Sequence, residues 1–159
     1  MSSFKDFPKP RVIMPKGKHT ATVIWIHGLT SSADKIYRIS LKHIINKPNL
    51  DHIKFILPNA RIMPVVCHKN RLVPAWYNIT SMENRLINKY EGKEESMKYL
   101  RSIILNEINN HNIPSNRIII GGFSSGAGIS IYTGYKCDKT LAGVISLSGY
   151  LVDLKLEVN

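Results

Sequence analysis

"RIIIGGFSSGAGIS", residues 117–130, runs from an apolar stretch into a turn crowded with glycines that has a serine at its centre. The apolar run over 116–122 predicts a buried strand, and the run of small residues over 124–135 predicts a helix. The turn between them fits G-x-S-x-G, in which the serine is exposed as a nucleophile and the N–H groups of the following helix stabilise an oxyanion. Ser124 is therefore the candidate nucleophile, and the backbone N–H of Ser125 is a candidate oxyanion donor.

The same pattern has a plainer explanation, because small residues in such a turn also let a helix pack closely on a sheet. A second feature of the sequence favours a catalytic role for the turn over a purely structural one. The apolar run 21–28 leads into His27, Gly28 and Leu29, and a His-Gly loop after an early strand supplies the other oxyanion N–H in α/β-hydrolases. The backbone of Leu29 is the predicted donor there, and we expect His27 to hold the loop rather than act as the catalytic base.

Buried strands alternate with helices along the rest of the chain. Strands are expected over 11–14, 21–28, 52–60, 116–122 and 141–151, and helices over 34–46, 93–112 and 124–135. Strands that are apolar throughout are buried on both faces, which is typical of parallel sheets. The order predicts one α/β domain over 1–159, with a mostly parallel, doubly wound sheet and helices on both of its faces. The stretch 61–92 has internal prolines and no steady period, so it is expected to be a long, partly ordered excursion.

Charge and composition narrow the classes of partner. The net charge is +11, and residues 1–80 hold 13 Lys and Arg against 3 Asp and Glu. These basic residues are spread singly, without a zinc finger or an RNA-binding aromatic motif, so no nucleic acid is expected. Weak contact with an anionic membrane surface stays compatible with the sequence. Cys67 and Cys137 have no metal-ligand spacing and are expected to be reduced thiols, with no metal bound. Without a signal peptide or a membrane-spanning run, the expected location is cytoplasmic.

Five blocks of the sequence occur in the order and approximate spacing of one known family. They are "VIWIHGLTSSAD", "FILPNARIMPVV", "PAWYNI", "NRIIIGGFSSGAGIS" and "LAGVISLSGYL". Together they resemble the acyl-protein thioesterase and lysophospholipase family, a cytosolic branch of the carboxylesterases with the α/β-hydrolase fold. The resemblance covers nearly the whole chain.

The resemblance implies hydrolysis of acyl thioesters or esters, including S-acylated cysteines and lysophospholipids, without a metal or organic cofactor. Ser124 would be the nucleophile, and the backbone amides of Leu29 and Ser125 would form the oxyanion hole. In this family the segment equivalent to 61–80 borders the acyl channel. The implied neighbours of the acyl group are Leu72, Val73, Pro74 and Trp76.

The sequence departs from the family after the last matched block. The triad order in α/β-hydrolases is Ser, then Asp or Glu, then His, but no histidine follows His111. Asp138 and Asp153 fit loop carboxylates better than a triad acid, and His68 is the only histidine considered as a substitute base. A serine without a base loses several orders of magnitude in rate, so this chain alone is expected to be weak or inactive.

The sheet is expected to lack its C-terminal strands, which would leave an unpaired apolar edge after 141–151 that aggregates, forms a dimer or needs a partner. Two alternatives to an enzyme stay open at this stage. The chain could be a non-catalytic acyl-binding protein that keeps the channel and has lost the base. It could also be a basic binder of membranes or nucleic acid, with strongly salt-dependent binding that does not depend on Ser124.

Overall fold

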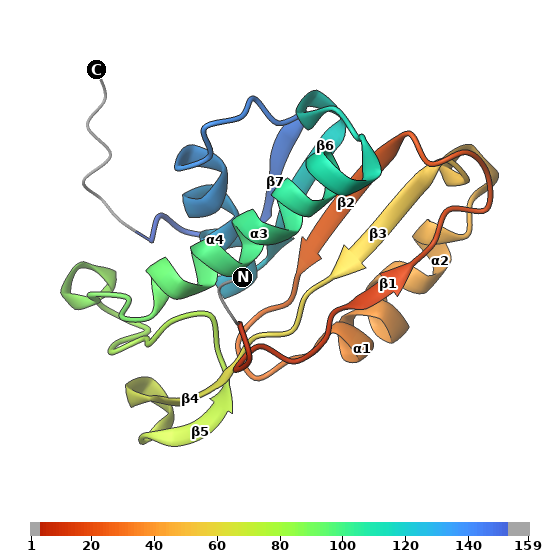
Figure 1. Ribbon diagram of the computed structural model, residues 1–159. Coiled ribbons are helices and arrows are strands. Elements are labelled where there is room, and N and C mark those ends of the chain that lie inside the picture. Colours follow the sequence, from red (N-terminus) through yellow and green to blue (C-terminus); the bar gives the residue numbers. More distant parts are fainter. Residues whose placement is uncertain (1–3, 153–159) are drawn as a thin grey trace.

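The computed structural model describes residues 4–152, and a five-stranded sheet lies at its centre (Figure 1). The strand order is β1-β3-β2-β6-β7; β1 runs antiparallel to β3, and every other neighbouring pair is parallel. The strands are β1 (Arg11–Ile13), β2 (Ala21–Ile26), β3 (Ile53–Leu57), β6 (Ile118–Phe123) and β7 (Gly143–Leu147). Because parallel strands share a direction, the loops that follow β2 and β6 meet at the same end of the sheet.

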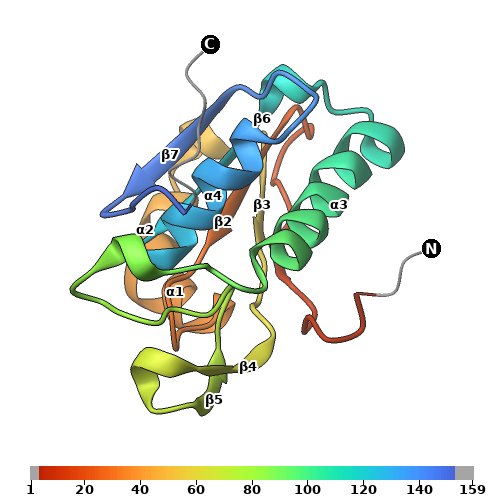
Figure 2. The same cartoon turned by 90° about the vertical axis from the view of Figure 1, so that its left-hand side faces the viewer.

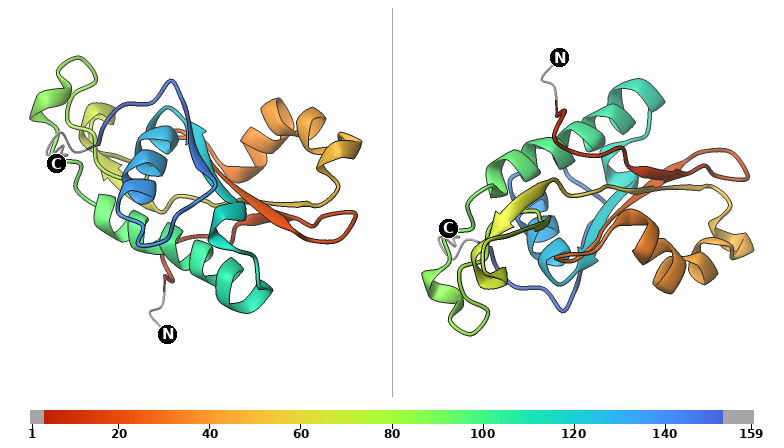
Figure 3. Two further views of the ribbon diagram at one scale, coloured as in Figure 1. Left: turned by 90° about the horizontal axis from the view of Figure 1, so that it is seen from above. Right: turned by 90° about the horizontal axis from the view of Figure 1, so that it is seen from below.

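Helices cover both faces of this sheet, as the sequence predicted (Figure 2, Figure 3). One face carries α1 (Ala33–Ile36), a π-helical turn (Tyr37–Leu41) and α2 (Lys42–Ile45). The other carries α3 (Lys93–His111) and α4 (Ser125–Tyr135). None of the helices described within 4–152 is long and apolar enough to cross a membrane.

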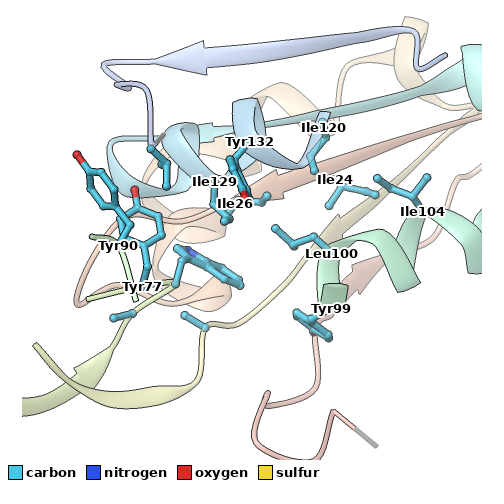
Figure 4. Close-up of a cluster of buried hydrophobic side chains, with 14 of the residues drawn as sticks. Ile24, Ile26, Tyr77, Tyr90, Tyr99, Leu100, Ile104, Ile120, Ile129 and Tyr132 are labelled. Carbon is cyan, nitrogen blue, oxygen red and sulfur yellow. The ribbon is translucent and has the colours of Figure 1, made fainter. Parts of the chain in front are cut away.

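The core is divided between the two faces because successive residues of a strand point to opposite sides. Ile24 and Ile26 of β2 pack with Leu100 and Ile104 of α3 and with Ile129 of α4 (Figure 4). On the opposite side of the same strand, Val23 and Trp25 are partly buried. They pack against the smaller cluster, which includes residues of α1 and α2. This two-sided burial explains why apolar residues occupy consecutive positions over 23–26.

The segment 61–92 is more ordered than the sequence predicted. It contains an antiparallel hairpin of β4 (Ile62–Val65) and β5 (Arg71–Pro74), and the side chains of Trp76, Tyr77 and Ile79 are fully buried. The prolines concealed the strands, but a proline is tolerated where its missing N–H faces away from the partner strand. A two-stranded sheet leaves both outer edges free for such positions.

The last strand differs most from its prediction as a buried element. β7 lies at the edge of the sheet, and its Val144, Ile145 and Leu147 are 40–49% exposed. Helix α4 packs on one face of β7, whereas no helix described within 4–152 covers the other face. Ile145 and Leu147 are exposed because they face the uncovered side, whereas Val144 faces α4. The predicted helix over 34–46 is also broken, by the π-helical turn between α1 and α2.

Candidate active site

Ser124 occupies the turn between β6 and α4 in a strained conformation. Its φ of 55° and ψ of −120° lie in a region that side-chain-bearing residues rarely adopt. The Ser124 N–H donates to the carbonyl oxygen of Leu147 on β7, at 2.9 Å, and the Ser124 carbonyl oxygen accepts from Gly128 in α4, at 3.1 Å. The turn is thus fixed from both sides, and the partly exposed side chain of Ser124 is held at the end of the strand.

The two outer glycines of the motif are required by close contact with β2. A Cβ on Gly122 would lie 2.5 Å from the carbonyl oxygen of Ile26. A Cβ on Gly126 would lie 2.5 Å from the carbonyl oxygen of His27 and nearer still to that of Ile26. Real Cβ atoms essentially never approach another atom this closely. The glycines therefore do more than permit a turn, because they let the start of α4 lie against the backbone of β2.

The loop after β2 lies against the turn that carries Ser124. A Cβ on Gly28 would lie 3.5 Å from the Cβ of Ser124, so the two turns lie side by side with room for little more than a hydrogen at Gly28. Thr30, with φ 61°, donates its N–H to the carbonyl oxygen of Pro74, at 3.0 Å, which anchors the far side of the loop. Leu29 lies between these anchors, and Leu29 and Ser124 line the same cavity.

His27 anchors the loop that follows β2, as expected, and its side chain is not exposed to a substrate. Its Nε2 accepts the N–H of Ala60 at 3.1 Å, which leaves Nδ1 to donate to the carbonyl oxygen of Gly28 at 2.7 Å. Its ring is buried, and burial lowers the pKa of His27 below its ordinary value. The indole N–H of Trp76 also donates to the His27 carbonyl oxygen, at 2.7 Å. A neutral ring with both nitrogens engaged positions the loop and cannot serve as a general base.

Tyr77 is a positioning residue that the sequence did not reveal. Its buried hydroxyl donates to the carbonyl oxygen of Ser125 at 3.0 Å and shares a hydrogen bond of 2.9 Å with the hydroxyl of Tyr150. Burial, the largest cause, raises the pKa of Tyr77 well above its usual value, so the hydroxyl stays protonated. The first peptide of α4 is thereby fixed behind the nucleophile. An aromatic residue inside a stretch without a clear period gives no sign of this role in advance.

No described residue is placed to act as the base for Ser124. His68 lies in the turn between β4 and β5 and does not line the cavity beside Ser124. His19 and His111 lie instead near Glu107, at 3.6 and 3.8 Å. Asp138 pairs with Arg101 at 2.7 Å before the start of β7, at the other end of the sheet. The other aspartate considered, Asp153, lies outside the described residues.

The structure separates the predicted acyl-channel residues into different environments. Leu72 is 70% exposed on β5, Val73 packs against the core, and Trp76 is completely buried. Pro74 contributes its backbone carbonyl to the loop anchor at Thr30. None of these four side chains lines the cavity that contains Leu29 and Ser124. Their role as neighbours of the acyl group therefore stays a prediction.

That cavity is a broad groove of about 810 Å³ on the face of the sheet that carries α1 and α2. It begins at Leu29 and Ser124 and extends along the strands as far as Ile53 at the start of β3. Its walls are mainly apolar, and Lys35 is its one charged lining residue. Among the described residues, no group of His, Cys, Asp or Glu is arranged to hold a metal ion.

A strained serine between a parallel strand and a helix, beside a backbone loop from the neighbouring strand, defines the α/β-hydrolase class. The phospholipase/carboxylesterase family model matches residues 8–157, and the chain belongs to that family. Among solved structures, SOBER1 from Arabidopsis thaliana superposes with a TM-score of 0.76 at 22% identity, over 84% of this chain and 63% of that one. Acyl-protein thioesterase 2 from Zea mays superposes at 0.69 and 25% identity, over 90% and 62%.

Sequence relatives carry the family assignment further. Acyl-protein thioesterase 1 homolog 2 of Dictyostelium discoideum is 40% identical over 144 residues, which are 91% of this chain and 64% of the relative. Homolog 1 from the same organism is 42% identical over 134 residues, which are 84% and 58%. The chain thus spans less than two thirds of the length of these relatives.

Proposed function

We propose that this chain carries the nucleophile and oxyanion hole of a serine hydrolase that cleaves acyl thioesters or carboxylic esters. Ser124 is the nucleophile, and the backbone N–H groups of Leu29 and Ser125 bind the oxyanion. The observation that carries the proposal is the positive φ of Ser124 at the junction of β6 and α4, in contact with the loop after β2. Strained conformations cost about 1–3 kcal/mol and cluster at active sites, which supports a functional role for this serine.

The reaction would proceed by acyl transfer to Ser124. The Oγ atom attacks the carbonyl carbon of the acyl group as its proton passes to a base, and the carbonyl oxygen becomes an oxyanion held by the Leu29 and Ser125 amides. Collapse of this intermediate breaks the bond to the thiolate or alkoxide, which leaves with a proton. Water then attacks the acyl-serine by the same route, releases the carboxylic acid and restores Ser124. No metal or cofactor takes part in these steps.

The proposal requires an Asp or Glu and a His that residues 4–152 do not supply. The sequence has no histidine after His111, and no described histidine lines the cavity at Ser124. An enzyme stripped of its triad partners retains about 10³–10⁴-fold catalysis over water through the oxyanion hole and binding. We therefore expect the 159-residue chain alone to hydrolyse substrates slowly, and a chain supplied with both partners to be fully active.

The names of the relatives support a proposal for the substrate class, and the sequence supports one for the location. Two relatives are acyl-protein thioesterases, and the family model is named for phospholipases and carboxylesterases. We propose S-acylated protein, with depalmitoylation as the reaction, and lysophospholipid or simple esters as further substrates, in the cytoplasm. The acyl chain would pass Leu72, Val73, Pro74 and Trp76. The basic first half of the chain would favour weak contact with an anionic membrane, where S-acylated proteins and lysophospholipids lie.

Turnover of an S-acylated peptide and of a lysophospholipid tests this proposal. The 159-residue chain should be slow with both, and fusing to it the part of the Dictyostelium homolog 2 that lies outside the match should raise the rate by several orders of magnitude. Ser124→Ala should abolish both rates. Ser115→Ala, at the opposite end of β6, is the matched control and should leave them unchanged. Equal rates for Ser124→Ala and Ser115→Ala would refute the assignment of the nucleophile.

A second candidate is an acyl-binding protein without turnover. It is favoured by one observation, the absence of a histidine beside Ser124 within residues 4–152. It predicts saturable binding of a long-chain acyl ligand by the 159-residue chain, with no product released even from the fused protein. The turnover assay above therefore separates the two candidates.

A further inference from the structure

The loop that carries the predicted oxyanion donor Leu29 runs from the end of β2 to the start of α1, and we call residues 27–33 the oxyanion loop. Among residues 4–152, the Leu29 N–H donates to no described group, whereas the N–H of Ala33 donates to the Oδ1 of Asn59 at 2.8 Å. An oxyanion donor must point in the right direction before the reaction begins. The direction of the free Leu29 N–H therefore depends on how the two ends of the oxyanion loop are held.

Asn59 joins the end of the oxyanion loop to the N-terminal segment of the chain. While its Oδ1 accepts the Ala33 N–H, its Nδ2 donates to the carbonyl oxygen of Lys9, at 2.9 Å. The two bonds fix the orientation of the carboxamide, because turning it over would place its NH₂ group against the Ala33 N–H. Ala33 is the first residue of α1, where N–H groups have no partner within the helix. Asn59 supplies the acceptor that the helix lacks.

The start of the oxyanion loop is held through a stack of aromatic rings. The carbonyl oxygen of His27 accepts the indole N–H of Trp76, at 2.7 Å, and the Trp76 side chain is completely buried. The ring of Phe7 is stacked on Trp76, with centroids 6.4 Å apart and an interplanar angle of 21°. Phe7 is also stacked on Tyr99, at 4.2 Å and 18°. A close-packed ring keeps its position while the side chains around it fill the space. Phe7 therefore helps to position the indole N–H that holds the His27 carbonyl.

Phe7 and Lys9 belong to one N-terminal segment, residues 4–10, which we call the strap. The strap contains no helix or strand, and four of its seven residues are exposed. Segments with few buried contacts open more readily than strands inside a sheet. The strap reaches the start of the oxyanion loop through Phe7 and its end through the Lys9 carbonyl. Loss of the strap contacts would therefore release both ends of the loop together.

We infer that Phe7 and Asn59 are positioning residues for the oxyanion loop, through which the strap holds both ends of the loop and sets the direction of the Leu29 N–H. The inference rests on the proposed function, because it assigns a control element to the same oxyanion hole. Ser124 is held separately, by hydrogen bonds to β7 and to α4. Release of the strap should therefore weaken the oxyanion hole without moving the nucleophile.

The rate at which a fluorophosphonate labels Ser124 in the 159-residue chain tests this inference. Asn59→Leu removes both hydrogen bonds with a side chain of similar volume, and Phe7→Ala removes the stacked ring. Each variant should lower the second-order rate constant of labelling by about tenfold, since a small misplacement of a catalytic group is costly. Asn59→Asp keeps an acceptor for the Ala33 N–H and should be labelled faster than Asn59→Leu.

Asn88→Leu is the matched control for a purely structural role. Asn88 is buried, and its Oδ1 accepts the N–H groups of Thr80 and Ser81 at 2.6 and 2.9 Å, while its Nδ2 donates to the Ser81 carbonyl oxygen at 2.9 Å. None of these groups belongs to the oxyanion loop. The variant should lose stability, but under conditions where circular dichroism shows every variant to be folded it should be labelled at the rate of the parent.

Hydrogen exchange of the peptide that contains 27–33 gives a second readout, which does not need a reactive serine. This peptide should exchange faster in Asn59→Leu and Phe7→Ala than in the parent and in Asn88→Leu. Labelling of Asn59→Leu and Phe7→Ala at the rate of Asn88→Leu would overturn the inference. If the parent is never labelled, the proposed hydrolase fails instead, and exchange alone decides. Unchanged exchange over 27–33 would then overturn the role of the strap, and faster exchange would support it.

Discussion

Replacing Gly126 with alanine tests whether the start of α4 lies directly against β2. The new Cβ would lie 2.3 Å from the Ile26 carbonyl oxygen and 2.5 Å from that of His27, so the helix would have to move by about 0.7 Å to reach even a tight contact of 3.0 Å. Overpacking of this kind costs about 1–3 kcal/mol, and backbone atoms on both sides put Gly126 at the upper end. Alanine recovers about 1 kcal/mol through its helix propensity. The net loss in free energy of unfolding is about 2 kcal/mol.

Urea unfolding followed by circular dichroism measures this loss. Gly126→Ala should lower the midpoint without changing the slope, and thermal unfolding should shift down by about 4–8 °C for a chain of this size. Gly143→Ala is the matched control, because nothing lies within 4 Å of its Cβ position. That variant should be as stable as the parent or slightly more stable. If Gly126→Ala were as stable as Gly143→Ala, the close packing at the nucleophile turn would be wrong.

Three further predictions concern the residues that support the sheet and the site. Burial lowers the pKa of His27 below its ordinary value of 6.5, so as the pH falls the unfolded state is protonated before the folded state. The free energy of unfolding should therefore be constant with respect to His27 above pH 6.5 and should decrease below it. The urea midpoint of His27→Gln should decline less than that of the parent over this range, and an equal decline would contradict the buried neutral ring. Tyr77→Phe should cost about 1–2 kcal/mol, since the Ser125 carbonyl loses its donor, and a neutral result in urea unfolding would count against that bond. Lys54→Met should lower the free energy of unfolding by about 3 kcal/mol or more, because the buried carboxylate of Glu107, 2.7 Å from Lys54, loses its cation. Adding Glu107→Leu should recover much of that loss. A double variant no more stable than Lys54→Met would show that the charge pair is not the cause.

The sequence predicted the parts of the fold that depend on local pattern. Helix α3 begins and ends within one residue of the predicted 93–112, because its apolar positions Met97, Leu100, Ile104 and Ile108 recur at helical spacing over about three turns. The strands of 21–28 and 116–122 were recognisable because burial on both faces places apolar residues at consecutive positions, 23–26 in the first and 118–120 in the second. The turn that carries Ser124 was also predictable, because close backbone contacts exclude residues with a Cβ at its two outer glycines.

Features that depend on distant contacts could not be predicted from the sequence. The hairpin of β4 and β5 is stabilised by pairing between strands, and its prolines imitate a loop. Burial of Glu107 beside Lys54 and Thr22 involves three separate elements, and no spacing in the sequence links them. The exposure of β7 was not predicted, because an apolar run indicates that a strand is suited to burial but does not show whether a helix packs on each of its faces. The groove could not be predicted for the same reason.

The position of Tyr77 behind Ser125 belongs to the same class of contact. Forty-eight residues separate the hydroxyl from the carbonyl that it binds, and only the folded sheet brings them together. Similarly, the partners of the two His27 nitrogens could be assigned only once Ala60 was seen beside the ring.

The central claim is that Ser124 is a nucleophile held beside an oxyanion hole, and intact-mass measurement after treatment with a fluorophosphonate tests it most directly. The folded 159-residue chain should gain a single adduct slowly, Ser124→Ala should gain none, and Ser115→Ala should react like the parent. Peptide mapping should place the adduct on Ser124. An adduct that persists in Ser124→Ala, or a folded chain that never reacts, would contradict the claim.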